Sequence, residues 1–213
     1  VEADYAHFQR SECFGLLAKY DDQVKELNKL IYSYPYSAYS EKSQLEIAKT
    51  YLLQDKYQET LKALSDFKAK YPESISISEV KLKTGLVYSN MDKYEKAILS
   101  FKEVVSEYPG TPESIEAIRL AEIVYKRSQK ISEYLDWVST ISFVDFKEST
   151  LDSTAYDAAF DVYAGGDGMQ SLQAMDAYIG RFPLGIFKVP ANYYAAQCAE
   201  KLELFSRAEE YYE

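Results

Sequence analysis

Apolar residues recur along the chain at the three- and four-residue spacing of amphipathic helices, and short polar breaks interrupt them at regular intervals. The pattern is clearest over residues 74–110, where two helical stretches are separated by a break at residues 90–93. Tyr-Pro or Phe-Pro closes several stretches, at residues 34–35, 71–72, 108–109 and 182–183. The first three of these prolines are 37 residues apart, and the fourth follows after twice that distance. A fixed period of this length, combined with helical spacing, predicts an all-α repeat architecture.

The residue types inside the period agree with its length. Tyrosines recur every 37 residues, at Tyr51, Tyr88 and Tyr125. Small residues share a second position of the period, at Ala48, Gly85, Ala159 and Ala196. A small residue at a helix crossing allows the two axes to approach, and a large aromatic residue beside it fills the remaining space.

The clearest copy of the period resembles the tetratricopeptide repeat. It follows the family's order of small, aromatic, aromatic, alanine, aromatic and proline, as Gly85-x2-Tyr88-x5-Tyr94-x2-Ala97-x3-Phe101-x7-Pro109. The usual unit has about 34 residues, so the period of 37 indicates a longer link between units. The resemblance implies a right-handed α-solenoid of about six helix pairs, the last of them truncated.

The period divides the chain into one continuous array of six units, at residues 1–36, 37–73, 74–110, 111–147, 148–184 and 185–213. The fourth unit departs most from the pattern, with Glu122 in the small-residue position and no proline at its closing position, where Phe146 stands. In the first unit we expect a helix over residues 3–20 and a break at Asp21-Asp22. The chain begins without methionine and stops about ten residues before its last helix should end, so we expect a fragment of a longer protein.

Charge and cysteine content narrow the function classes. The net charge of −10 disfavours nucleic acid and anionic lipid surfaces as partners, and no apolar run is long enough to cross a membrane. Cys13 and Cys198 are five periods apart, so the helix pairs stacked between them would keep their sulfurs too far apart for a disulfide. Two unpaired thiols fit a reducing compartment without excluding the periplasm.

No stretch of the sequence points to catalysis, a metal or a cofactor. His7 is the only histidine, and one imidazole is too few for a zinc site or a hydrolytic triad, so we expect it to pack or lie at the surface. The glycine-rich residues 165–168 match neither a phosphate-binding loop nor a calcium loop, and we interpret them as a turn between two helices. We therefore predict a protein that is not an enzyme.

The resemblance implies a concave groove, lined by the first helix of each unit, that binds a peptide or helix of another protein. The lining positions in this chain are Tyr5, Phe8, Lys42, Lys49, Leu82, Leu86, Arg119, Lys126, Arg127, Tyr156, Phe160, Tyr163 and Tyr193. They form a basic centre between two aromatic ends, which suits a segment with acidic and apolar side chains. The alternative is that the aromatic residues belong to the core and the cations to a solvated face.

One subclass is not supported. Chaperone-binding members hold a terminal carboxylate with asparagine and lysine at fixed inner positions, and the clearest unit has Leu86 and Ser89 there. The longer unit, the Tyr-Pro-x-Ser junctions and the tyrosine content instead resemble bacterial envelope members, such as BamD-like and Tol-Pal-associated lipoproteins and periplasmic repeat proteins of Bacteroidota. This likeness implies a periplasmic address and a role in outer-membrane assembly, with a cytoplasmic address as the alternative.

Two other functions stay open at this point. One is a structural spacer or self-association module that makes its contacts through uncapped solenoid ends. The other is a regulatory domain of a larger protein. Neither requires a groove ligand.

Overall fold

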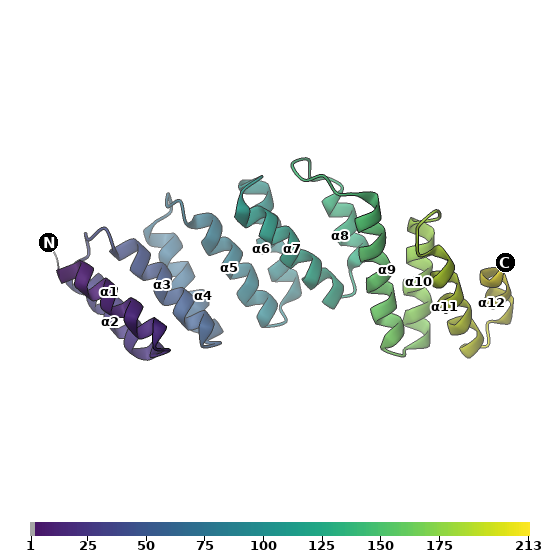
Figure 1. The fold of residues 1–213 in the computed structure, drawn as a ribbon, viewed down its shortest axis with the longest axis horizontal. Coiled ribbons are helices and arrows are strands. Elements are labelled where there is room, and N and C mark those ends of the chain that lie inside the picture. The colour runs from purple at the N-terminus through teal and green to yellow at the C-terminus, as the bar shows by residue number, and fades with distance from the viewer. Residues whose placement is uncertain (1–2) are drawn as a thin grey trace. The chain divides into compact units, whose positions relative to one another are not determined.

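The computed structural model describes residues 3–213, and these residues form helices and no strand. The predicted all-α class is therefore confirmed. The chain divides into two compact units, residues 1–120 and residues 121–213, and helix α7 (Pro112–Arg127) crosses from one to the other. In each unit consecutive helices pair side by side, as the colours along the chain show in Figure 1.

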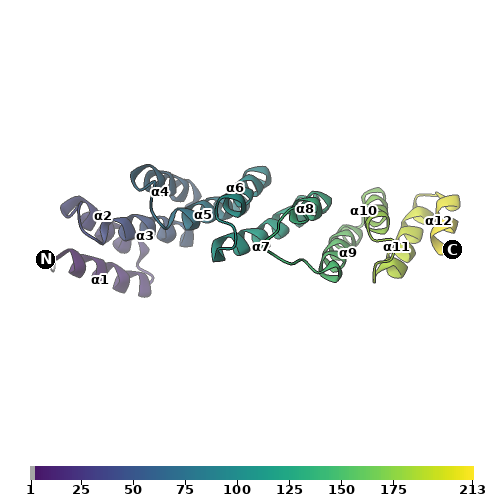
Figure 2. The same cartoon turned by 90° about the horizontal axis from the view of Figure 1, so that it is seen from above.

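The unit of residues 1–120, described from residue 3 on, contains three helix pairs before α7 begins. They are α1 (Ala3–Leu16) with α2 (Tyr20–Ser33), α3 (Ser40–Leu53) with α4 (Tyr57–Lys70), and α5 (Ile77–Asn90) with α6 (Tyr94–Glu107). Within this unit the first helices of the pairs form one layer and the second helices form another (Figure 2).

The boundary predicted inside the first pair is wrong. Helix α1 ends at Leu16 rather than at residue 20, and Asp21 and Asp22 lie in the first turn of α2. Carboxylates near a helix N-terminus interact favourably with the helix dipole. The two aspartates therefore begin the second helix and do not break the first.

The unit of residues 121–213 takes up the end of α7 and continues with five further helices. They are α8 (Ile131–Val138), α9 (Glu148–Ala164), α10 (Gly168–Arg181), α11 (Lys188–Lys201) and α12 (Phe205–Tyr212). Helix α8 has only eight residues, and residues 139–147 after it are not helical. The sequence from Val138 to Val144 is rich in β-branched residues and serine, which disfavour helix.

The turn inside each helix pair has the same backbone conformation throughout residues 3–213. Positive φ angles of 54° to 84° recur every 37 residues, at Ala18, Asp55, Asp92, Gln129, Gly166 and Glu203. A residue in the left-handed region ends one helix and lets the chain reverse. The period is therefore visible in the backbone itself, and the interpretation of residues 165–168 as a turn is confirmed.

Side chains fix several of these turns. The Tyr57 hydroxyl donates to Asp55 (2.9 Å), which is the left-handed residue of its turn. Asp167 accepts a hydrogen bond from the backbone N–H of Gln170 (2.9 Å) and so caps the N-terminus of α10.

The junctions between pairs are built around the aromatic-proline dipeptides. The aromatic residue follows the helix end and donates its backbone N–H to the carbonyl four residues earlier, at Tyr34, Tyr71, Tyr108 and Phe182. The proline after it cannot continue the helix. Serine hydroxyls then tie two junctions to the preceding first helix, from Ser37 to Asp4 (2.6 Å) and from Ser74 to Glu41 (2.5 Å).

Small residues at the helix crossings allow the pairs to close. A Cβ atom on Gly85 would stand 2.6 Å from the ring of Phe101, which is fully buried. In the fourth predicted unit the same position holds Glu122, which is half-buried, and the small residue that is fully buried there is its neighbour Ala121. The adjacent position thus meets the packing requirement that Glu122 does not.

Candidate interaction surface

The predicted binding residues all lie on first helices of the pairs. In residues 1–120 they are Tyr5 and Phe8 on α1, Lys42 and Lys49 on α3, Leu82 and Leu86 on α5, and Arg119 on α7. In residues 121–213 they are Lys126 and Arg127 on α7, Tyr156, Phe160 and Tyr163 on α9, and Tyr193 on α11. They therefore form one group in each unit.

In residues 121–213 the four predicted aromatic residues belong to one continuous cluster on α9 and α11. The ring centroid of Phe160 lies 6.1 Å from that of Tyr156 and 5.9 Å from that of Tyr163. Tyr194 joins the two helices, 5.3 Å from Phe160 and 4.6 Å from Tyr163. Tyr193 lies 5.5 Å from Tyr194. These spacings are typical of interacting aromatic pairs, and we refer to the five residues as the α9–α11 aromatic surface.

Sequence reasoning missed two aromatic residues at this place. Tyr194 adjoins Tyr193, and neighbours on a helix point about 100° apart, so assigning one to a groove position excluded the other. Phe187, just before α11, stacks on Tyr156 with ring centroids 4.5 Å apart and an interplanar angle of 10°. The Tyr193-Tyr194 doublet was the signal available in the sequence.

The α9–α11 aromatic surface is partly exposed and is braced by hydrogen bonds. Phe160 is 37% exposed and Tyr193 is 50% exposed. The Tyr163 hydroxyl donates to Gln197 Oε1 (2.7 Å), and Gln197 Nε2 donates to the Tyr193 hydroxyl (2.8 Å). Burial raises the pKa of Tyr163 above its ordinary value, which favours the protonated phenol that donates to Gln197. Fixed aromatic rings with open faces are the usual anchors of protein–protein contacts.

The aromatic residues at the start of the other unit are arranged differently. Phe8 is buried, only 2% exposed, and its ring centroid lies 5.3 Å from that of Tyr39. The Lys42 ammonium lies over the Phe8 ring, 4.6 Å from its centroid. Tyr5 remains 48% exposed beside Tyr39. Phe8 is thus part of the core, and Tyr5 is the member of this pair that a ligand could reach.

The predicted basic centre consists largely of cations that have carboxylate partners. Lys49 Nζ lies 3.6 Å from Glu46 and 3.0 Å from Glu79. The other pairs are Lys42 with Glu12, Arg119 with Glu116, and Lys126 with Glu122. A hydrogen bond from Arg119 holds the pKa of Glu116 below its usual range. The positive charges of these helices are therefore largely neutralised by neighbouring carboxylates.

The remaining predicted residues offer limited contact area or charge. Leu82 and Leu86 are half-buried on α5. Arg127 lines a cavity of about 260 Å³ together with Asp161 of α9, so a carboxylate shares its surroundings as well.

The groups weighed for chemistry have structural roles. His7 is half-buried, and its Nδ1 lies in hydrogen-bond contact with Glu26, which also accepts from Arg10. Across residues 3–213 no three His, Cys, Asp or Glu side chains are grouped so that they could hold a metal ion. Within the same range none of the helices combines the length and hydrophobicity that a membrane crossing requires.

Two family models match parts of this chain. A model described as an outer membrane lipoprotein matches residues 17–87, and a model of the tetratricopeptide repeat matches residues 79–111. No curated protein sequence matches the chain.

Several solved structures are similar over nearly the whole chain. A tetratricopeptide repeat protein from Parabacteroides merdae has a TM-score of 0.59 at 15% identity, covering 99% of this chain and 78% of that one. The TPR2AB domain of yeast Sti1 in complex with pHSP90 has a TM-score of 0.53 at 15% identity, covering 99% and 75%. Pseudomonas aeruginosa pilF has a TM-score of 0.51 at 15% identity, covering 99% and 89%. At such identities the likeness establishes the fold, an all-α solenoid of helix pairs.

Proposed function

Because this chain is a tetratricopeptide repeat protein, we propose that it is a non-catalytic scaffold that binds a peptide or helix of another protein on the first helices of its pairs. The observation that carries the proposal is the α9–α11 aromatic surface. Its rings are fixed by mutual contact and hydrogen bonds, so a ligand that packs on them loses little additional side-chain freedom. Two of them, Phe160 and Tyr193, offer open faces as anchors.

The other predicted residues take secondary roles in this proposal. Tyr5 gives an exposed aromatic contact in residues 1–120, and Leu82 and Leu86 add apolar area. The cations act by exchange: an acidic residue of the ligand replaces the internal carboxylate of a pair such as Lys49–Glu79. Since an exposed ion pair is worth about 0–1 kcal/mol, this exchange selects for acidic and apolar ligands without adding much affinity.

The proposal extends to a role in the bacterial envelope. The match of residues 17–87 to an outer membrane lipoprotein model supports a periplasmic address and a task in outer-membrane assembly. The solved complex of yeast Sti1 with pHSP90 supports the use of this fold to hold a segment of another protein.

A second candidate function is self-association through the terminal helices. Leu16 and Leu17, at the end of α1, are 89% and 65% exposed, and Phe205 on α12 is 68% exposed. Exposed apolar residues at the ends of a repeat array favour end-to-end contacts. Sedimentation velocity tests this candidate: growth in mass with concentration, abolished by Leu16→Lys, would favour it over the scaffold.

Affinity capture from the native cell envelope tests the scaffold. We compare the wild-type protein with Phe160→Ala/Tyr193→Ala, with Arg119→Glu/Lys126→Glu/Arg127→Glu, and with Tyr32→Ala. Tyr32 is an 89% exposed aromatic residue on α2, so its removal is the matched control on the other layer. We expect the aromatic double variant to lose the captured partner roughly tenfold or more, the charge variant to lose a few-fold, and Tyr32→Ala to retain it. Equal capture by the aromatic double variant and the wild type would contradict the proposal.

A further inference from the structure

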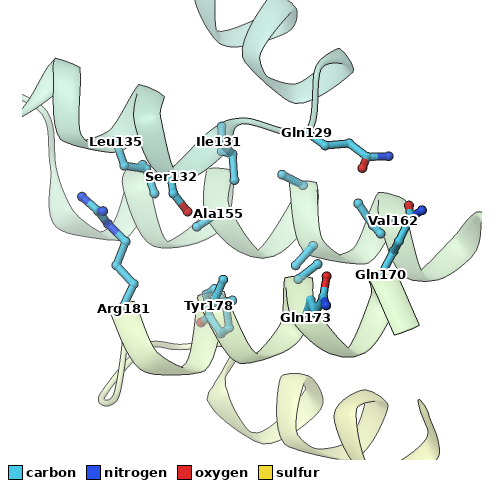
Figure 3. A pocket seen from close by; sticks show the side chains of 14 residues that line it. Gln129, Ile131, Ser132, Leu135, Ala155, Val162, Gln170, Gln173, Tyr178 and Arg181 are labelled. Carbon is cyan, nitrogen blue, oxygen red and sulfur yellow. The ribbon is translucent and has the colours of Figure 1, made fainter. Parts of the chain in front are cut away.

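A cavity of about 230 Å³ lies between α8, α9 and α10 (Figure 3). Its buried floor comes mainly from small apolar residues of α9, namely Ala155, Ala158 and Ala159, with Val162 beside them. Its exposed rim carries Gln129, Ser132, Gln170, Gln173 and Arg181. None of these residues belongs to the α9–α11 aromatic surface, so the cavity is a separate feature of this unit.

The repeat itself provides a comparison, because a cavity of similar size, about 220 Å³, occupies the matching place between α4, α5 and α6. Five of the residues that line it there are Lys81, Thr84, Tyr88, Ser100 and Glu103. The residues 74 places later, which is two periods, are Ala155, Ala158, Val162, Ala174 and Ala177, and all of them line the cavity of α8, α9 and α10. The hollow is therefore a property of the repeat, but in residues 121–213 every one of these side chains is smaller and apolar.

This exchange changes what can occupy the cavity. Lys81, which lines the earlier cavity, pairs with Glu107 (2.5 Å), and charged walls of this kind suit water. In the later cavity Arg181 is the single charged residue among the described lining, and its guanidinium is bound to Asp136 (2.6 Å). With no uncompensated charge, the lining favours a neutral apolar occupant.

The volume limits the occupant further. Sites for drug-sized molecules and cofactors occupy about 300–1,000 Å³, so about 230 Å³ suits one or two side chains rather than a whole cofactor. The glutamines at the rim, Gln129, Gln170 and Gln173, carry amides that can both donate to and accept from a peptide backbone. An apolar floor with an amide rim matches one buried anchor side chain and the main chain that presents it.

We propose that the cavity between α8, α9 and α10 is a second docking site, which receives an uncharged apolar anchor (Leu, Ile, Met or Phe) from a segment of another protein. The site uses α8 and α10, the second helices of their pairs, together with α9. It therefore allows a second polypeptide to bind while the first-helix face is occupied.

Methyl NMR with small probes tests the proposal directly. Alanine methyl groups are labelled in the full chain, and N-acetyl-leucinamide and N-acetyl-phenylalaninamide are titrated to concentrations on the order of 10 mM, where single-anchor binding is detectable. We expect the methyl signals of Ala155, Ala158 and Ala174 to shift with saturation. N-acetyl-lysinamide and the amide of N-acetyl-aspartate should leave them unchanged. Equal shifts with the charged probes, or none with the apolar ones, would overturn the proposal.

Variants taken from the earlier repeat separate binding from folding. Val162→Tyr/Ala177→Glu installs the residues found at Tyr88 and Glu103, which the same fold already accommodates. It should weaken probe binding roughly tenfold or more. The reverse variant, Lys81→Ala/Glu103→Ala, should give the earlier cavity a measurable affinity for N-acetyl-leucinamide. This gain requires a folded protein, so it keeps the test decisive even if the first variant is unstable.

A second copy of this chain is the remaining alternative occupant of the cavity. If a second copy of this chain filled the cavity, sedimentation velocity would show a wild-type dimer that Val162→Tyr returns to monomer. That outcome would replace the proposed partner with the chain itself. Phe160 and Tyr193 do not line this cavity, so Phe160→Ala/Tyr193→Ala should bind the apolar probes like the wild type. Equal capture by that variant would contradict the scaffold without touching this site, and absent probe binding would overturn this site without touching the scaffold.

Discussion

The first helices of the two units carry different surfaces on the same repeat. In residues 1–120 they present ion pairs, of which Lys49 between Glu46 and Glu79 is the most extended. In residues 121–213 they present the α9–α11 aromatic surface, centred on Phe160. The turns beneath are alike, with a left-handed residue at Asp92 in one unit and at Gly166 in the other. The period thus determines where side chains lie on the fold, whereas the residue types at the exposed positions determine what each unit can bind.

If each surface depends on the helix packing of its own unit, a substitution at a close helix crossing should reduce stability. The largest effect is expected at Gly85. Gly85→Leu places a side chain where even a Cβ would stand 2.6 Å from Phe101. Because Phe101 is fully buried and cannot withdraw without opening a gap, we expect a loss of about 2–3 kcal/mol in the free energy of unfolding. Urea denaturation followed by circular dichroism measures it.

The other unit offers a matched control. At Gly180 on α10, an added Cβ would have no heavy atom within 4 Å apart from its chain neighbours and the backbone of its own helix, and its φ is not positive. Gly180→Ala should therefore leave stability unchanged or raise it by up to about 0.5 kcal/mol, since alanine is the better helix former. A loss from Gly180→Ala as large as that from Gly85→Leu would contradict the packing account.

The two units should also differ in how pH affects their stability. In acid, the response should come from Glu26 in residues 1–120. Burial alone would raise the pKa of Glu26, but hydrogen bonds from Arg10 and His7 outweigh it and hold this pKa below the ordinary value of 4.5. A lowered folded pKa means that the stabilisation is present at higher pH and is lost as pH falls below 4.5 and through the folded pKa. We expect Glu26→Gln to flatten the acid limb of a plot of melting temperature against pH. An acid limb as steep as that of the wild type would rule out this role for Glu26.

At alkaline pH, the stability of residues 121–213 should decrease. Burial and a hydrogen bond to Asp176 raise the pKa of Tyr211 from 10.0 to about 12. A raised folded pKa gives stabilisation that is complete below pH 10 and is lost as pH rises towards 12. Tyr211→Phe should remove this part of the alkaline decline, and titration of the phenolate absorbance should lose the Tyr211 share of its late step, to which Tyr134 and Tyr178 also contribute because burial raises their pKa values. An unchanged late step would assign it to another tyrosine.

Much of the fold followed from the sequence because the period depends on few residues. The proline of each aromatic-proline dipeptide follows a helix end, and a glycine such as Gly85 marks a close crossing, so both can be identified without a structure. The first boundary was misplaced because Asp21-Asp22 reads equally as a break or as the acidic start of a helix. The left-handed residues could not be recognised, since Ala18, Gln129 and Glu203 carry no sequence signal for that conformation.

The interaction surface followed less well, for reasons that concern neighbours in space. The cations were visible in the sequence, as were partners one turn away such as Glu122 for Lys126, but Glu79 reaches Lys49 from the next first helix and could not be identified. Phe8 and Phe160 look alike in sequence, yet one is covered and the other is open. Periodicity assigns a residue to a face of its helix, whereas burial depends on what the adjacent helix places over it.

The smallest expected effect concerns the turns, where the two units place different residues in the same left-handed conformation. Ala18 adopts φ 54° and Gly166 adopts φ 84° at equivalent positions of the period. A left-handed conformation costs an L-residue about 1–2 kcal/mol, and glycine offsets part of that relief by its larger unfolded-state entropy, about 0.5–1 kcal/mol. We therefore expect Ala18→Gly to stabilise the protein by about 0.5 kcal/mol and Gly166→Ala to destabilise it by a similar amount, both measured by urea denaturation. The opposite signs test whether the turn itself carries the cost, because a general effect of glycine content would move the stability of both variants in the direction opposite to this prediction.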